Sequence, residues 1–173
     1  MITVQITHMK KFLLMALLLA PLSLFAQKFG HFNSADIIQL MPEYKTSQDE
    51  LQKLQQQYET EIKAMQEELQ RKSTEYEKDK ATLPDNIRQR REQEMQDLYA
   101  RIQQTSQDDQ QALQKASGEK MQAIADKVKN AVKAIGDAGG YVYIMDLTAG
   151  IPYISTQLSK DVTAEIKAKL GLQ

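Results

Sequence analysis

The stretch LQKLQQQYETEIKAMQEEL, residues 51–69, decides the fold of this chain. Its large apolar residues recur every three or four positions, which is the spacing of one face of an α-helix. The residues between them are mainly Gln, Glu and Lys, which all tolerate a helix. So narrow an apolar stripe cannot form a globular core, but it can join one helix to another. The stripe consists of Leu51, Leu54, Tyr58, Ile62, Met65 and Leu69.

The helical pattern extends outward from this stretch in both directions. Residues 43–82 contain no Gly or Pro, and Pro42 suits the first turn of a helix. The strong break in the middle lies at residues 83–86, where Pro84 disfavours helical geometry at the residue before it. A second helical run then covers residues 87–135. Because a short connection implies antiparallel neighbours, we expect residues 42–136 to form a coiled-coil hairpin, the arm, with its tip near residues 83–86.

The apolar stripe of the second helix weakens halfway along. Between Ile102 and Leu113 the expected seam positions hold Thr105 and Asp109. Local stability follows local apolar contact, so we expect the arm to open or bend here at modest cost.

The two ends of the chain have a different character. Aromatic and β-branched residues favour strands at residues 28–32, 141–145 and 151–155. Asn33 or Ser34 can cap a short helix at residues 35–40. A last helix, capped by Ser159 or Asp161, places Val162, Ile166 and Leu170 on one face. The fold class is therefore mainly α, with a small β base from which the arm projects.

Residues 27–41 and 137–173 are expected to form this base, the body. So few residues seldom fold without extra support, and the chain has no Cys to supply disulfides. We therefore expect the body to be completed by oligomerisation through apolar residues of its strands. The residues assigned to this contact are Phe29, Phe32, Val142, Ile144, Ile151 and Tyr153.

The N-terminus has the pattern of a secretory signal peptide. Lys10 and Lys11 precede an apolar run at residues 12–20, and a break at Pro21 leads to a small residue, Ala26. The run is short for a membrane span, which needs ~20 residues. We predict cleavage after Ala26 and export to the periplasm, with residues 1–8 as an upstream mis-start. The alternative is an uncleaved membrane anchor. The mature chain would carry 20 basic and 23 acidic side chains, a net charge of −3.

The residue inventory argues against catalysis. The mature chain has a single histidine, His31, which we expect to be packed or on the surface, and it has no Gly-rich loop in the strand–loop–helix order that binds phosphate. Paired carboxylates for acid–base chemistry need a cleft, and a two-helix rod offers none. We therefore expect no enzyme, no cofactor and no metal. The slight acidic balance argues against nucleic-acid binding.

The tip of the arm is locally basic. Residues 71–91 contain seven basic and four acidic side chains, a net charge of +3. One interpretation is a solvated helix end with ion pairs within each helix. The other is a contact with an anionic membrane surface or with an acidic segment of a binding partner. The candidate residues are Lys78, Lys80, Arg88, Arg90 and Arg91.

The terminal segments carry a resemblance to a known family. The segment KFGHFNSADIIQ, residues 28–39, is similar to the opening strand and short helix of the Skp/OmpH family of periplasmic chaperones. The closing strand–strand–helix order of that family resembles three segments near the C-terminus. These are YVYIMD (residues 141–146), GIPYIS (residues 150–155) and KDVTAEI (residues 160–166).

The resemblance implies a homotrimer whose pooled strands form a small barrel, with three arms around a central cavity. It implies an ATP-independent holdase that binds unfolded outer-membrane proteins and prevents their aggregation. The family's best-known member is strongly basic, whereas this mature chain is acidic, so a positive field over the whole cavity is not expected here. Two alternatives stay open: a periplasmic coiled-coil spacer or scaffold, and a prefoldin-like subunit, which conflicts with the signal peptide.

Overall fold

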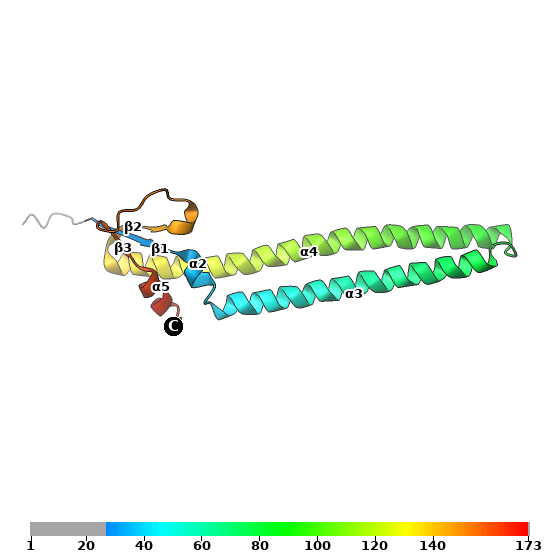
Figure 1. Cartoon of the computed structure of the whole chain (residues 1–173), viewed down its shortest axis with the longest axis horizontal. Helices are drawn as coiled ribbons and strands as arrows, with labels where there is room; N and C mark the ends of the chain where they lie inside the picture. The colour runs from blue at the N-terminus through cyan, green and yellow to red at the C-terminus, as the bar shows by residue number, and fades with distance from the viewer. Residues whose placement is uncertain (1–26, 173) are drawn as a thin grey trace, which may run out of the picture.

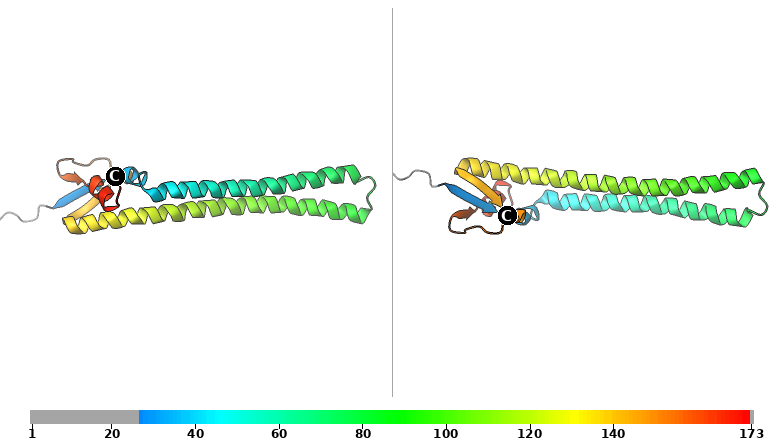
Figure 2. Two further views of the ribbon diagram at one scale, coloured as in Figure 1. Left: turned by 90° about the horizontal axis from the view of Figure 1, so that it is seen from below. Right: turned by 90° about the horizontal axis from the view of Figure 1, so that it is seen from above.

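The computed structural model describes residues 27–172, and the predicted signal peptide lies outside the described residues. Two long helices, α3 (Pro42–Asp79) and α4 (Asp85–Gly139), run antiparallel and form the arm (Figure 1). They contain 38 and 55 residues, so they are about 57 and 83 Å long at ~1.5 Å per residue. The two views of Figure 2 show them side by side along the length of α3. The predicted hairpin is confirmed.

The helix ends follow the local chemistry of the sequence. Pro42 is the first residue of α3, where its missing N–H costs no hydrogen bond. Pro84 precedes α4 in an extended conformation. Gly140 ends α4 with φ 64°, a left-handed conformation that favours glycine over residues with a side chain.

Three parallel strands form the sheet of the body. The strand β1 (Lys28–Phe32) lies between β2 (Tyr141–Asp146) and β3 (Ser159–Asp161), in the order β2-β1-β3. In the register, Gly30 pairs with Ile144 on one side and with Lys160 on the other. The N-terminal strand is thus held between two strands from the other end of the chain, as expected from the weakness of isolated strand pairs.

The prediction of a strand at residues 151–155 is wrong. After β2 the chain forms a 3-10 turn, η1 (Leu147–Ala149), and residues 150–158 then form an irregular loop. The third strand follows this loop, at Ser159–Asp161. Pro152 lacks the N–H that a paired strand position needs, which fits its place in the loop.

The core lies where the body meets α4. The helix α2 (Ser34–Ile38), capped by the Asn33 side chain, and the last helix α5 (Thr163–Lys169) pack on α4. Ile37, Val162 and Ile166 have no exposed surface. They contact buried residues of α4, among them Ile124 and Val128. The body therefore closes on the last third of α4, and the rest of the hairpin projects away from it (Figure 1).

Candidate functional site

The arm has a thin apolar seam. Beyond the part of α4 that packs in the body, only Tyr76 and Ile102 of the two described arm helices are buried. The other predicted stripe residues, Leu51 to Leu69, are partly buried, as expected for a two-helix contact open on both sides. Most of the surface of the arm is therefore available to other molecules.

Ion pairs join the two helices near the body. Lys127 Nζ lies 2.5 Å from Glu43 Oε1, and Lys120 pairs with Glu50. Hydrogen bonds from these lysines hold the pKa of Glu43 and of Glu50 below its ordinary value. Glu43, Glu50 and Lys127 are exposed and Lys120 is half-buried, so the pairs align the helices and add little stability.

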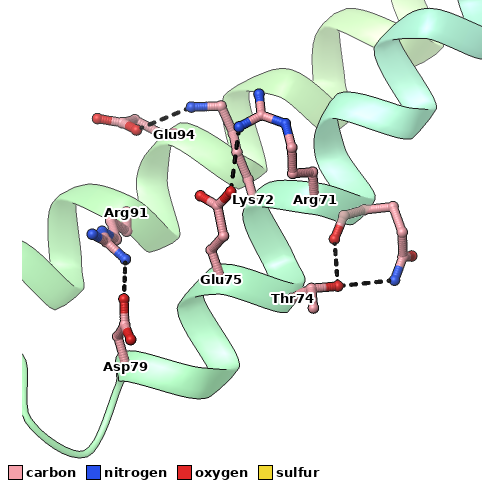
Figure 3. Close-up of polar contacts among 8 residues, drawn as sticks. Arg71, Lys72, Thr74, Glu75, Asp79, Arg91 and Glu94 are labelled. Carbon is pink, nitrogen blue, oxygen red and sulfur yellow. Dashed lines mark hydrogen bonds and ion pairs between the residues drawn. The ribbon is translucent and has the colours of Figure 1, made fainter.

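A second set of polar contacts joins the helices near the tip (Figure 3). Lys72 Nζ lies 3.5 Å from Glu94 Oε2, and Arg91 Nη1 lies 3.5 Å from Asp79 Oδ2. Between these pairs, the hydroxyl of Tyr76 donates a hydrogen bond to Glu92. This bond raises the pKa of Tyr76 above its ordinary value. The end of the arm is therefore held together by polar groups around one buried aromatic ring.

The predicted basic residues do gather at the tip, but most of them face an acid. Four of the five have an acidic partner within 4.0 Å, and no acid pairs with Lys78 in the described chain. The pairs are Lys80 with Glu77, Arg88 with Asp85, Arg90 with Glu94, and Arg91 with Asp79. Much of the positive charge of the tip is thus balanced locally.

The body exposes an apolar surface. Among the residues assigned to oligomerisation, Val142 is 58% exposed and Tyr153 is 80% exposed. Ile151 is partly exposed, and Phe29 stacks on Tyr143 with ring centroids 4.7 Å apart. Phe32 and Ile144 lie instead in or against the core of the subunit itself.

Sequence reasoning missed further exposed apolar residues of the body, among them Tyr143, Met145 and Leu158. Both faces of β2 are partly open, so the alternation that normally marks the outer face of a strand gives no signal for Tyr143. Leu158 lies in the loop of residues 150–158, just after the stretch for which the sequence predicted a strand. An apolar surface of this kind on a small body is typical of an interaction site.

His31 is packed in the body, which is one of the two settings that the sequence left open. It is 7% exposed, and its Nδ1 lies 2.9 Å from Ser159 Oγ across the β1–β3 pair. Within residues 27–172 no cluster of His, Asp and Glu side chains is suited to hold a metal ion. In the same part of the chain, no helix has the length and apolar character of a membrane span.

Comparisons with known proteins agree with this architecture. The OmpH-like outer membrane protein family matches residues 28–170. The fold is similar to that of a Caulobacter crescentus protein, with a TM-score of 0.71. The crystal structure of that protein describes it as an OmpH-like, proposed outer membrane chaperone. The two chains are 14% identical, and the likeness covers 83% of each. No curated protein matches the chain. The match includes the whole arm and nearly all of the body, so this chain belongs to the OmpH-like family.

Proposed function

We propose that this protein is an ATP-independent periplasmic holdase chaperone that binds unfolded outer-membrane proteins and prevents their aggregation. The observation that carries the proposal is the arm, which extends far from the body. Outside the contact with the body, only two of its described residues, Tyr76 and Ile102, are buried. A long surface joined by so thin a seam can contact an extended chain over many residues. The family membership and the name of the Caulobacter protein support the same role.

The proposal includes a homotrimer. The small body leaves Val142 and Tyr153 largely in solvent, and burial of such side chains in a contact with other subunits is favourable by about 25 cal/mol per Å² of apolar surface. Both β2 and β3 are edge strands with unpaired backbone groups, which can accept a strand from a neighbour. Three arms held at one end would then surround a shared space.

A dilution experiment tests the holdase function. A urea-unfolded outer-membrane β-barrel protein is diluted into buffer without ATP, with or without the mature protein, and light scattering is followed. We expect the mature protein to suppress scattering at about one trimer per client. If scattering is unchanged, the protein is better explained as a structural spacer.

A shortened arm provides the matched control. The pairs Glu43–Lys127, Glu50–Lys120 and Asp79–Arg91 share one register, so residues 65–75 lie opposite residues 95–105. Deleting both segments removes eleven residues, or about three turns, from each helix and keeps the helical phase. We expect this variant to keep the oligomeric state of the body but to suppress aggregation less. Equal suppression by both proteins would contradict a role of the arm.

The tip is proposed to make a second, weaker contact with anionic membrane surfaces. Lys78 and the outer faces of the paired arginines present the positive charge for it. Four of the five cations are already paired, so we expect this contact to be weak. Because it is electrostatic, we also expect it to be sensitive to salt.

A further inference from the structure

The middle of the arm contains a groove between the two helices. Its volume is about 400 Å³, within the range of ~300–1,000 Å³ in which proteins hold small organic groups. Eight residues line it: the largely apolar Tyr58, Ile62 and Leu113, the carboxylates of Glu59 and Asp109, the hydroxyl of Ser106, and the amides of Gln55 and Gln110.

The groove lies where the helices are least tied to each other. In the described chain, no ion pair or side-chain hydrogen bond crosses between α3 and α4 from the Glu50–Lys120 pair to the Lys72–Glu94 pair. The α4 seam in this interval has Asp109 at a position where an apolar residue would fill the gap. A polar residue at a seam position leaves space between the helices, and the groove is that space.

The carboxylate of Asp109 marks the groove as more than a packing defect. Its Oδ2 is buried and has no hydrogen-bond partner among the described protein groups. A buried acceptor without a donor is unfavourable, and the great majority of such atoms in proteins are paired. The nearby amide of Gln55 does not serve it, because its Nε2 donates to Glu59 Oε1 at 2.8 Å.

The charge of the groove indicates what would complement it. Glu59 and Asp109 are acidic, and none of the residues that line the groove is basic. A lysine or arginine side chain would supply the missing donor to Asp109 as a charge-assisted hydrogen bond, the stronger kind. An apolar side chain beside that cation would contact Tyr58, Ile62 and Leu113.

We propose that this groove binds a segment of unfolded polypeptide in which an apolar side chain stands close to a lysine or arginine. The proposal rests on the proposed holdase function and names a chemical preference of the arm. Strands of outer-membrane barrels alternate apolar and polar residues, so segments of this composition are common in the proposed clients. The arm would then hold a client by recurring local contacts of this kind rather than by overall charge.

A pair of peptides tests the proposal. The probe is a fluorescent twelve-residue peptide that alternates Leu or Tyr with Arg, and its partner has Gln in place of each Arg. Binding is measured by fluorescence anisotropy to the mature protein and to two variants, Asp109→Asn and Asp108→Asn. Asp108 is the matched control, because it is exposed on the same helix and accepts a hydrogen bond of 2.8 Å from Gln104 Nε2.

We expect Asp109→Asn to weaken binding of the Arg peptide about tenfold, which corresponds to ~1.4 kcal/mol. Binding of the Gln peptide should change much less, and Asp108→Asn should bind both peptides as the unmodified protein does. Equal affinity of the unmodified protein for the two peptides, or equal losses in the two variants, would overturn the proposal. A change of oligomeric state in Asp109→Asn, with peptide binding unaltered, would assign the groove to a second copy of the chain and would also overturn it.

The outcome of the peptide-binding test can be distinguished from the outcome of the aggregation test of the holdase function. If the mature protein suppresses client aggregation but shows no Asp109-dependent preference for the Arg peptide, the groove proposal fails and the holdase stands. If the preference is present but aggregation is not suppressed, the groove stands as a peptide site and the holdase fails.

Discussion

The carboxylate of Asp146, the last residue of β2, accepts a hydrogen bond from the backbone N–H of Ser34, the first residue of α2, with Oδ1 3.2 Å from the nitrogen. The same oxygen accepts a second bond of 3.0 Å from the Thr148 N–H. One side chain therefore ties a strand from the C-terminal part of the chain to a helix near its start. Burial opposes ionisation of this carboxyl, but the hydrogen bonds from Ser34 and Thr148 outweigh it and hold the pKa of Asp146 below its ordinary value.

We expect Asp146→Ala to lower the free energy of unfolding by about 1 kcal/mol, because two backbone N–H groups lose their acceptor. Urea unfolding at one fixed subunit concentration measures the change, since assembly also contributes to stability. Asp49→Ala is the control, because Asp49 is exposed on α3. Its effect should stay within about 0.5 kcal/mol. Equal effects of the two substitutions would argue against the link between β2 and α2.

The same carboxylate predicts a dependence on pH. Since the pKa of Asp146 is lower in the folded than in the unfolded chain, its ionised form adds stability above the unfolded value of about 3.9. This stability is lost as the pH falls through the folded pKa. The difference in unfolding free energy between the unmodified protein and Asp146→Ala should therefore be constant near neutral pH and shrink below about pH 4. A difference that grows on acidification would contradict this assignment.

Two glycines should respond to alanine in opposite directions. A Cβ at Gly30 would lie 3.0 Å from Ile144 Cγ1 and 3.2 Å from Tyr141 Cδ1, so Gly30→Ala should destabilise the body by about 1–3 kcal/mol. A Cβ at Gly118, inside α4, would meet nothing within 4 Å, so Gly118→Ala should stabilise the protein by about 0.5–1 kcal/mol. Thermal or urea unfolding of the two variants checks both signs. A stabilising Gly30→Ala would mean that β1 and β2 are less closely packed than described.

The proposed assembly surface is tested by Val142→Lys. This change places a charge on the exposed edge of β2 and should shift the protein from trimer towards monomer in sedimentation velocity at low micromolar concentration. Tyr99→Lys is the matched control, because Tyr99 is 57% exposed against 58% for Val142 but lies on the arm. The control should keep the trimer. If both variants keep it, the subunits associate through another surface.

At the tip, the triple substitution Arg88→Gln, Arg90→Gln and Arg91→Gln should weaken binding to vesicles that contain anionic lipid. Sedimentation of the protein with vesicles measures the effect, and binding of the unmodified protein should fall as salt is raised. Neutral vesicles are the control and should bind neither protein. Unchanged binding of the triple variant to anionic vesicles would remove the tip from the contact.

The arm could be predicted from the sequence because its signals are local. The spacing of residues such as Leu51 and Ile62, together with the breaks at Pro42 and Pro84, depends on neighbours within a few positions along the chain. The weak middle of the seam was visible in the same way, as Asp109 at a seam position. The sequence could not show that Oδ2 of Asp109 lacks a hydrogen-bond partner, because this depends on which groups of α3 face the carboxylate.

The body was harder to predict because its contacts are distant in sequence. The strand β3 consists of Ser, Lys and Asp, which have little intrinsic preference for strands, and it exists because it pairs with β1. Residues 151–155 have that preference but take part in neither strand pairing of the described sheet. Likewise, the alternation of side chains along β1 could not predict that Phe32 packs inside its own subunit. The helices that cover Phe32 come from both ends of the chain.

The position of β1 between β2 and β3 imposes an order on folding. Its two neighbours are more than a hundred residues further along the chain, so the sheet cannot close until the last segment has been made. Helix formation in the arm needs no such delay, because its hydrogen bonds span four residues. The two arm helices can therefore form first. Until β2 and β3 are available, β1 stays unpaired and is exposed to incorrect pairing.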